Sequence, residues 1–364
     1  MSFTSLANKY ICDVPVYEPG RPIEEVAREL GLKPFGIIKL ASNENALGPS
    51  PFAVAAIHRA LKTVHLYPDG GGYYLRQALA KKLGVEMDNI VLGTGSNEII
   101  EFLYHAFVAP GDEIVAGDRA FVIYSIMAKM FQANCVEVPF KGHTHNLDAM
   151  RAAITDKTKL VFIANPNNPT GTRVRNAELE RFIRSLPAHV ICVLDEAYIE
   201  FLNDPPPSVE YAMKHNVVLL RTFSKIVGLA GLRIGYGVAQ KECIALLQKV
   251  RQPFNVNSVA QAGALAALDD TQHIAKTKGV TRRGVEFLEN EFKQLKLEFV
   301  PSCANFVLVN VGDGDKVFRG LQQRGVIVRP MRGYKMPEWL RVTVGLPEEN
   351  RKFINALKAE LNHE

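Results

Sequence analysis

Residues 217–237 read VVLLRTFSKIVGLAGLRIGYG, a short apolar run that ends in a polar turn and leads to a second run. The first run, Val217–Leu220, is too short for a helix, and its aliphatic and β-branched residues predict a buried strand. The turn places Lys225 directly behind that strand, and Arg233–Val238 predicts the next strand. A buried strand that ends in a polar turn is the unit from which this part of the chain is built.

The middle of the chain repeats this unit, with longer amphipathic stretches between several of the strands. Strands that alternate with helices predict an α/β domain whose mostly parallel sheet is buried on both faces. The other predicted strands are Ile90–Leu92, Glu113–Ala116, Cys135–Val138, Leu160–Ala164 and Val190–Leu194.

From about Asn257 the pattern changes and predicts a smaller α+β domain. We expect a large domain at 46–254, with 1–45 and 255–364 forming an N-terminal arm and the small domain. The predicted elements outside the large domain are helices at 23–30, 260–268 and 277–295, strands at 306–309, 326–329 and 340–344, and a last helix from 347 to the end.

The composition excludes several classes of function. Of the 364 residues 47% are hydrophobic and 22% are charged, which is typical of a globular protein. The net charge of +5 comes from scattered lysines and arginines, so we expect no nucleic-acid partner. No apolar stretch reaches the ~18 residues of a membrane span, and no signal-peptide pattern is present. Five dispersed cysteines favour a reducing cytoplasm over a disulfide framework.

Polar clusters follow four of the predicted strands. Ligands in open α/β sheets bind beyond the carboxyl ends of the strands, so we expect these clusters to meet at one site. Packing alone does not explain four such clusters in succession. They are GTGSN at 93–97, NPNNPTG at 165–171, DEAY at 195–198 and RTFSK at 221–225.

The first cluster predicts a phosphate site. Gly95, Ser96 and Asn97 open a helix, where free N–H groups and the positive helix end attract anions. Glu98 replaces the third glycine of a dinucleotide fingerprint, and no Walker lysine is present. Arg233 could add a bidentate guanidinium. An ordinary glycine-containing helix cap is an equally good reading of this cluster alone.

The other clusters hold candidate catalytic residues. Asp195 ends an apolar strand, where a carboxylate is costly unless a cation pairs with it. Tyr198 lies one helical turn further on, and Lys225 could form a Schiff base if burial or another cation lowers its pKa. Taken singly, Asp195 reads better as a helix cap, Asn168 as a turn residue and Lys225 as a surface lysine.

The two histidines of His143-Thr144-His145 could suggest a metal site. No partner with metal-ligand spacing accompanies these histidines, and a solvated loop is the better reading. We therefore expect no metal.

The chain resembles fold-type I enzymes that depend on pyridoxal 5′-phosphate (PLP) and, among them, the histidinol-phosphate aminotransferases. The likeness extends from Tyr17 beyond Arg341. It is carried by LASNENALGPSP at 40–51, LYPDGGGYYLRQALA at 66–80, LGTGSNEIIEFL at 92–103, ANPNNPTGT at 164–172, DEAYIEF at 195–201, RTFSKIVGLAGLRIGYG at 221–237, PFNVNSVAQ at 253–261, ANFVLV at 304–309, GVIVRPM at 325–331 and LRVTVGLPEENRKF at 340–353.

The resemblance implies a role for each cluster. Lys225 would hold PLP as a Schiff base and then move the substrate proton. Asp195 would pair with the pyridine nitrogen, while Asn168 and Tyr198 would bind the ring oxygen and Phe121 would stack on the ring. The residues expected around the cofactor phosphate are Gly95, Ser96, Asn97, Thr222, Ser224 and Arg233.

The resemblance also implies the substrates and a homodimer. Tyr17, Arg329 and Arg341 would bind the phosphate of L-histidinol phosphate, and Arg341 would also receive a carboxylate of glutamate or 2-oxoglutarate. Tyr67 would reach the cofactor phosphate of the neighbouring subunit. The implied reaction converts histidinol phosphate and 2-oxoglutarate to imidazole acetol phosphate and glutamate, in histidine biosynthesis, by a ping-pong mechanism.

Three departures from the family pattern leave alternatives open. Ala46 replaces a proline, Ile226-Val227 replaces a small-aromatic pair, and Arg119-Ala120 stands where Pro-Thr is common. Two rivals share the fold: an aromatic amino-acid aminotransferase, which would not need both Arg329 and Tyr17, and a PLP-dependent decarboxylase of a phosphorylated amino acid. A regulatory module of this fold would carry an added DNA-binding domain, and a structural role leaves the lysine unexplained.

Overall fold

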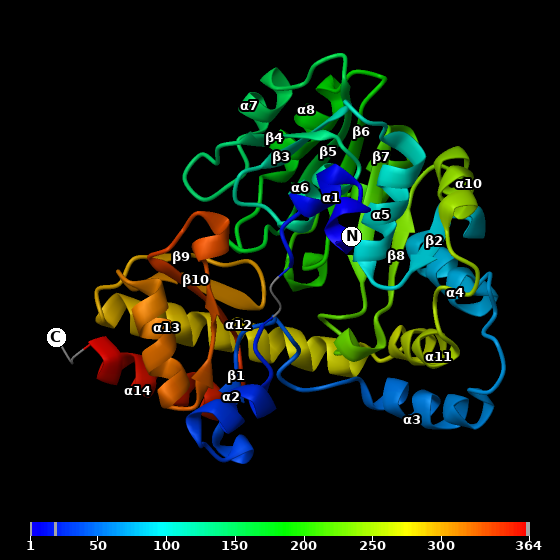
Figure 1. The fold of residues 1–364 in the computed structure, drawn as a ribbon. Helices are drawn as coiled ribbons and strands as arrows, with labels where there is room; N and C mark the ends of the chain where they lie inside the picture. The colour runs from blue at the N-terminus through cyan, green and yellow to red at the C-terminus, as the bar shows by residue number, and fades with distance from the viewer. Residues whose placement is uncertain (1, 18–19, 362–364) are drawn as a thin grey trace.

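The computed structural model describes residues 2–17 and 20–361, and these fold around two large β-sheets and one two-stranded sheet (Figure 1). A seven-stranded sheet occupies the upper part of the view, and a four-stranded sheet lies at the lower left. The long helix α12 (Thr271–Gln294) runs beneath both.

The seven-stranded sheet has the strand order β2-β8-β7-β6-β5-β3-β4. Its neighbours pair in parallel except at β8, which is antiparallel to both β7 and β2. The prediction of a mostly parallel sheet is therefore confirmed. Its strands are β2 (Ile90–Gly93), β3 (Glu113–Gly117), β4 (Asn134–Val138), β5 (Thr158–Ala164), β6 (Ile191–Asp195), β7 (Val217–Thr222) and β8 (Gly235–Val238).

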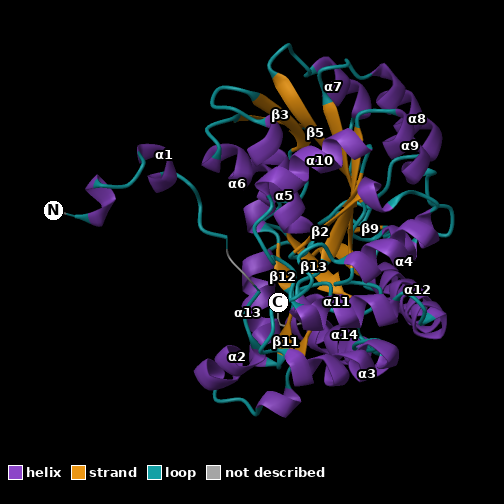
Figure 2. Cartoon of the chain, turned by 90° about the vertical axis from the view of Figure 1, so that its right-hand side faces the viewer, coloured by secondary structure: helices purple, strands orange, loops and turns teal. Residues whose placement is uncertain are grey.

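Helices cover both faces of this sheet (Figure 2). Its strands alternate side chains between two hydrophobic cores, so that Val161 and Ile163 face one core and Phe162 the other. The helices of the second core are α5 (Ser96–Phe107), α6 (Ile123–Met130) and α10 (Lys241–Val250). Those of the first are α3 (Pro51–Ala60), α4 (Tyr73–Leu83), α7 (Leu147–Ala152), α8 (Asn176–Ser185), α9 (Ser208–Lys214) and α11 (Ser258–Ala267).

The four-stranded sheet is antiparallel, in the order β12-β13-β10-β9, and packs on α12, α13 and α14. The prediction of one continuous strand at 326–329 was wrong. It divides into β11 and β12, and β11 pairs with β1 instead. The bounds are β1 (Ile38–Lys39), β9 (Phe299–Val300), β10 (Phe306–Asn310), β11 (Val326–Ile327), β12 (Arg329–Pro330), β13 (Trp339–Thr343), α13 (Gly314–Gln323) and α14 (Pro347–Leu361).

The division into domains at 254/255 stays a prediction. Helix α11 follows that point, yet its buried residues Ala260, Ala264 and Ala267 belong to a core of the seven-stranded sheet. The next helix, α12, carries Leu288 and Phe292 in the core of the small sheet.

The N-terminal segment leaves the body of the molecule, as Figure 2 shows. It contains α1 (Lys9–Cys12), which contacts α6, and α2 (Ile23–Leu30) follows it against the β1–β11 pair. Within residues 2–17 and 20–361, no helix has the length and apolarity needed to cross a membrane.

Two glycines of α12 make matched tests of the packing between this helix and the segment that follows β13. A Cβ atom at Gly284 would lie 2.2 Å from Cγ1 of Val344, whereas one at Gly279 would meet only the end of the Arg283 side chain, at 3.4 Å. We expect Gly284→Ala to lower the free energy of unfolding by about 1–3 kcal/mol through overpacking. Gly279→Ala should raise it by up to about 1 kcal/mol through helix propensity. Urea unfolding of the two variants checks this, and equal effects would contradict it.

Candidate active site

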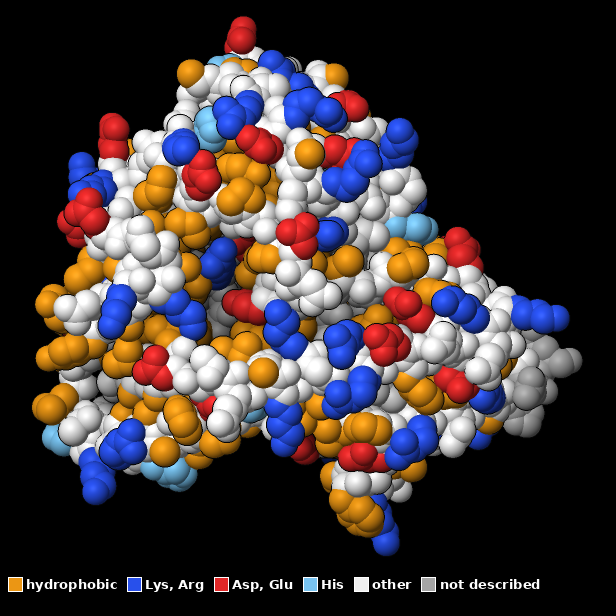
Figure 3. Space-filling model, turned by 180° about the vertical axis from the view of Figure 1, so that it is seen from behind, with side chains coloured by type: hydrophobic (Ala, Val, Ile, Leu, Met, Phe, Trp, Pro, Cys, Tyr) orange, Lys and Arg blue, Asp and Glu red, His pale blue; other side chains and the backbone are white. Residues whose placement is uncertain are grey.

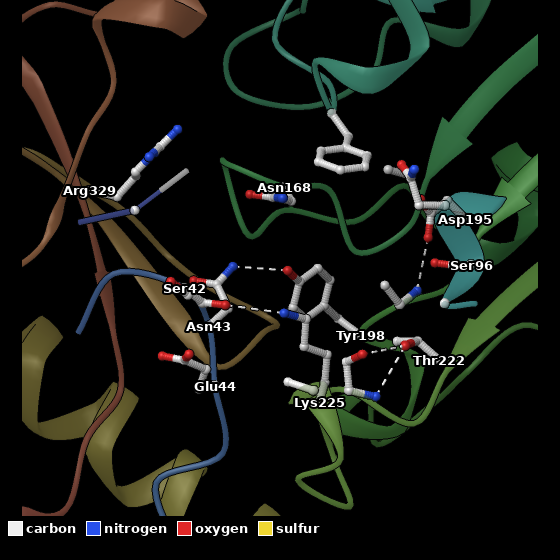
Figure 4. Close-up of a pocket in the computed structure, with 18 of the residues that line it drawn as sticks. Ser42, Asn43, Glu44, Ser96, Asn168, Asp195, Tyr198, Thr222, Lys225 and Arg329 are labelled. Carbon is white, nitrogen blue, oxygen red and sulfur yellow. Dashed lines mark hydrogen bonds between the residues drawn. The ribbon is translucent and has the colours of Figure 1, made fainter. Parts of the chain in front are cut away.

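The four polar clusters meet in one pocket of about 320 Å³ at the carboxyl edge of the seven-stranded sheet. Strands β2, β5, β6 and β7 point their carboxyl ends at it, and the segment after β1 and the strands β12 and β13 close the opposite side. Figure 4 shows Asp195 and Ser96 on one side, Arg329 on the other, and Lys225 between them. Of the predicted site residues, all but Tyr67 line this pocket.

Lys225 projects into the pocket from the turn after β7. Its Nζ donates to the carbonyl of Ser42 at 3.2 Å and lies 5.8 Å from the centre of the Tyr198 ring (Figure 4). Burial, together with the positive charge of Arg341, lowers the pKa of Lys225 to about 8. The uncharged amine, which is the nucleophilic form, is therefore far more populated near neutral pH than in a free lysine.

Asp195 is the last residue of β6 and is 6% exposed. Oδ2 of its carboxylate accepts a hydrogen bond from the hydroxyl of Tyr124 at 2.7 Å, and Oδ1 accepts one from the N–H of Ala197 at 3.2 Å. Burial raises the pKa of Asp195, and the bond from Tyr124 opposes this rise. The 3₁₀ helix that follows, Ile199–Phe201, has Tyr198 and not Asp195 as its N-cap residue.

The first turn of α5 forms one wall of the pocket. Its N-cap is Gly95, which has φ +75° and no side chain to satisfy the amides of the first turn. A Cβ atom at Gly95 would lie 2.8 Å from a guanidinium nitrogen of Arg233, so glycine permits the arginine to approach the helix end. Arg233 itself has φ +53°, at the end of a 3₁₀ turn and not within the predicted strand.

Hydroxyl groups complete this wall. The hydroxyl of Thr222 donates to that of Ser224 at 3.0 Å, and the N–H of Ser224 donates to Thr222 Oγ1 at 3.1 Å. Helix amides, hydroxyls and a guanidinium all offer hydrogen-bond donors, and this combination suits a phosphate group.

Two arginines define the opposite side. Arg329 of β12 and Arg341 of β13 are directly paired across neighbouring strands, where like charges repel unless an anion lies between them. Arg341 is buried. It donates to Oδ1 of Asn168 and, at 2.7 Å, to the carbonyl of Ala41. Its Nε atom is buried with no hydrogen-bond partner among the residues that the structure describes. This side is therefore built to receive an anion.

Three lining or supporting residues were missed from the sequence. Asn43 donates from Nδ2 to the hydroxyl of Tyr198 at 2.9 Å and is 1% exposed. Tyr334 reaches the pocket beside the arginines, and Tyr124 supports Asp195 from behind. Asn43 lies in the quoted segment LASNEN and could have been singled out there, whereas neither tyrosine belongs to a recognisable pattern.

Of three further aromatic residues predicted for the site, two line the pocket and one lies outside it. Phe121 lines the pocket, with its ring edge-on to Tyr124, and Tyr17 reaches the pocket from the N-terminal segment. Tyr67 lies outside it, 83% exposed and stacked on Phe254. Its predicted role in a neighbouring subunit stays a prediction.

The histidine pair differs from the solvated loop that was expected. His145 is buried, and its Nε2 atom lies 3.2 Å from the carbonyl oxygen of Ala164. Burial lowers the pKa of His145 to about 4, so this ring is neutral. The described part of the chain contains no group of three or more His, Cys, Asp or Glu side chains arranged to hold a metal.

Comparison with known proteins places this geometry in a family. Residues 36–357 match the model of class I and II aminotransferases. A histidinol-phosphate aminotransferase of Akkermansia muciniphila is 50% identical over 99% of this chain and 100% of its own length, and a histidinol-phosphate aminotransferase 1 of Cupriavidus pinatubonensis is 51% identical over 97% and 96%.

A solved structure agrees in fold along nearly the whole chain. It is the histidinol-phosphate aminotransferase of Sinorhizobium meliloti in complex with pyridoxal 5′-phosphate, which superposes with a TM-score of 0.89 at 27% identity and covers 99% of this chain and 98% of its own. With the lysine, the carboxylate and the anion-binding wall in one pocket, the chain belongs to the class I and II aminotransferases.

Proposed function

We propose that this protein is a PLP-dependent transaminase that converts L-histidinol phosphate and 2-oxoglutarate to imidazole acetol phosphate and glutamate. The observation that carries the proposal is one pocket that joins Lys225 and Asp195 to two separate anion-binding sides. Relatives named histidinol-phosphate aminotransferase, at about 50% identity over nearly the full chain, support it.

The residues of the pocket fit PLP. The wall made by the start of α5, Thr222, Ser224 and Arg233 would hold the phosphate, with Asp195 at the ring nitrogen and Phe121 against the ring face. Asn168 accepts from Arg341 through its amide oxygen, which leaves its NH₂ group to donate to the ring oxygen, beside Tyr198. When bound, PLP supplies an electron sink for the charge left by proton removal.

Lys225 would serve as both anchor and proton carrier. Its amine is the nucleophile in the pocket, and once released from the cofactor it can take a proton from one carbon and return it to another. The carbonyl of Ser42 accepts a hydrogen bond from the amine and restricts where it lies. Replacing Lys225 by alanine would remove both roles.

The paired arginines support two anionic substrates that use the site in turn. Arg329 and Arg341 would share the phosphate of histidinol phosphate with Tyr17, and Arg341 would bind a carboxylate of 2-oxoglutarate. A planar guanidinium can hold either anion in bidentate fashion. An aromatic amino-acid aminotransferase would need only the carboxylate site.

A homodimer is part of the proposal. Eight large apolar side chains around α3 and α4, here called the α3–α4 patch, are exposed: Phe52, Leu61, Val64, Leu66, Tyr67, Tyr73, Tyr74 and Phe254. In Figure 3, which shows the molecule from behind, hydrophobic side chains gather at the lower left, on the side where α3 and α4 lie. Exposed apolar patches of this kind mark interaction surfaces, and a second copy that covers this one could bring Tyr67 to its partner's phosphate wall.

The proposed location is the cytoplasm. The five cysteines are all free thiols, which suits a reducing compartment.

The first prediction concerns the amino donor. L-Histidinol phosphate, mixed with the holoenzyme without a keto acid, should convert the cofactor rapidly to its pyridoxamine form, whereas L-phenylalanine should do so slowly. Arg329→Gln should raise the donor concentration for half-maximal rate about 10- to 100-fold, because a hydrogen-bonded charge is lost. Stopped-flow absorbance measures both rates. Efficient conversion by phenylalanine alone would indicate an aromatic amino-acid aminotransferase. Release of CO₂ would indicate a decarboxylase.

The second prediction concerns pH. Only the uncharged amine of Lys225 attacks an aldehyde, and its pKa is lowered to about 8. The rate at which apoenzyme captures PLP should therefore rise about tenfold per pH unit below pH 8 and level off above it. In Arg341→Gln the repulsive charge is gone, so the midpoint should move upward. A midpoint near that of a free lysine in the unaltered enzyme would contradict the assignment.

The third prediction concerns Tyr67 and uses hybrid dimers. Tyr67→Ala and Lys225→Ala chains should each have little activity alone. In a hybrid, the intact Lys225 of one chain meets the intact Tyr67 of the other, so refolding an equal mixture should restore about a quarter of the wild-type sites. No recovery, in a mixture shown by mass spectrometry to contain hybrids, would place Tyr67 in its own subunit's function.

A further inference from the structure

Tyr124 lies directly behind Asp195 and belongs to none of the polar clusters that end the strands. It is in the first turn of α6 and is 1% exposed. Its hydroxyl donates to Oδ2 of Asp195 at 2.7 Å, which is the distance of a strong hydrogen bond to a charged acceptor. The contact joins a buried phenol to a buried carboxylate at the floor of the pocket.

The surroundings of Tyr124 fix the direction of that hydroxyl. Its ring stacks on Phe162 of β5, with centroids 4.3 Å apart and planes 14° from parallel. Its backbone carbonyl accepts a hydrogen bond from the hydroxyl of Tyr104 at 2.7 Å. With ring and backbone both held, the phenol oxygen is pre-positioned at the carboxylate.

The proton of this pair stays on the tyrosine. Burial and the neighbouring carboxylate raise the pKa of Tyr124 well above its ordinary value, so the phenol remains a donor. Burial also raises the pKa of Asp195, and the hydrogen bond from Tyr124 counters that rise. A carboxylate that loses this donor becomes more basic, and it competes better for a proton that would otherwise sit on a bound ring nitrogen.

We propose that Tyr124 is a positioning residue, whose hydroxyl keeps the Asp195 carboxylate ionised and directed at the pyridine nitrogen of the cofactor. The inference rests on the proposed use of PLP and deepens it. If packing were the only requirement here, phenylalanine would fill the same space without a buried hydroxyl, which is costly when it has no partner. The hydroxyl therefore acts through Asp195 on the charge of the ring.

The test compares Tyr124→Phe with Tyr104→Phe, each of which deletes one buried hydroxyl from a neighbouring tyrosine. The hydroxyl of Tyr124 bonds to Asp195 itself, whereas that of Tyr104 bonds to the backbone carbonyl of Tyr124, so Tyr104→Phe should have the smaller effect. We expect Tyr124→Phe to weaken binding of PLP to the apoenzyme about 10-fold or more, the effect of one lost bond to a charged group. It should slow the half-reaction at saturating donor similarly, with less than about a two-fold change in the half-saturating donor concentration.

The pairing with Asp195 is tested by a double variant. In an Asp195→Asn background, Tyr124→Phe should change the affinity for PLP by less than about two-fold, because its route of action is already gone. Thermal unfolding of all the apoenzymes checks that they fold. Equal losses in Tyr104→Phe and Tyr124→Phe, or a loss that persists in the Asp195→Asn background, would overturn the proposal. Affinity for PLP involves no amino donor, so a failure of the histidinol-phosphate assignment would leave this outcome readable.

Discussion

The buried carboxylate of Asp195 is the constraint on which the rest of the site depends. It ends a central strand of the sheet, and the hydrogen bonds that it receives come from neutral donors, Tyr124 and the backbone of Ala197. A charge held this way in an apolar core is costly until a cation reaches it. The cation of a protonated pyridine ring fits that requirement, and in the proposed function Lys225, which lines the same pocket, would hold the ring there.

The sheet topology explains why these groups converge. Parallel strands β5, β6 and β7 bring their carboxyl ends to one edge, and β8 returns antiparallel beside β2 so that Arg233 meets the start of α5. Close approach there depends on glycine, because a Cβ atom at Gly235 would lie 2.5 Å from the backbone nitrogen of Ser96. The phosphate wall thus follows from how tightly two strands and a helix pack.

The sequence allowed most of the fold and the pocket to be predicted, because short apolar strands and polar strand ends are local signals. The features that could not be predicted depend on contacts between residues far apart in the sequence. Helix α12 begins six residues before the prediction, since Asp270 caps it and Ser50, 220 residues away, donates to that carboxylate at 2.6 Å. Tyr124 sits in an ordinary amphipathic helix, so only the tertiary structure shows that it faces Asp195. The burial of His145 against the carbonyl of Ala164 likewise depends on a contact that the local sequence does not reveal.

The two sides of the pocket divide the chemistry between them. The wall on the large sheet offers neutral donors and Arg233 to one anion, while Arg329 and Arg341 face each other across β12 and β13 with a buried guanidinium nitrogen left unpartnered among the described residues. Two like charges paired in this way repel each other, and an anion bound between them would relieve that repulsion. In the proposed function, binding of the substrate anion would remove the repulsion between these arginines of the four-stranded sheet and so couple that sheet to the chemistry at Lys225.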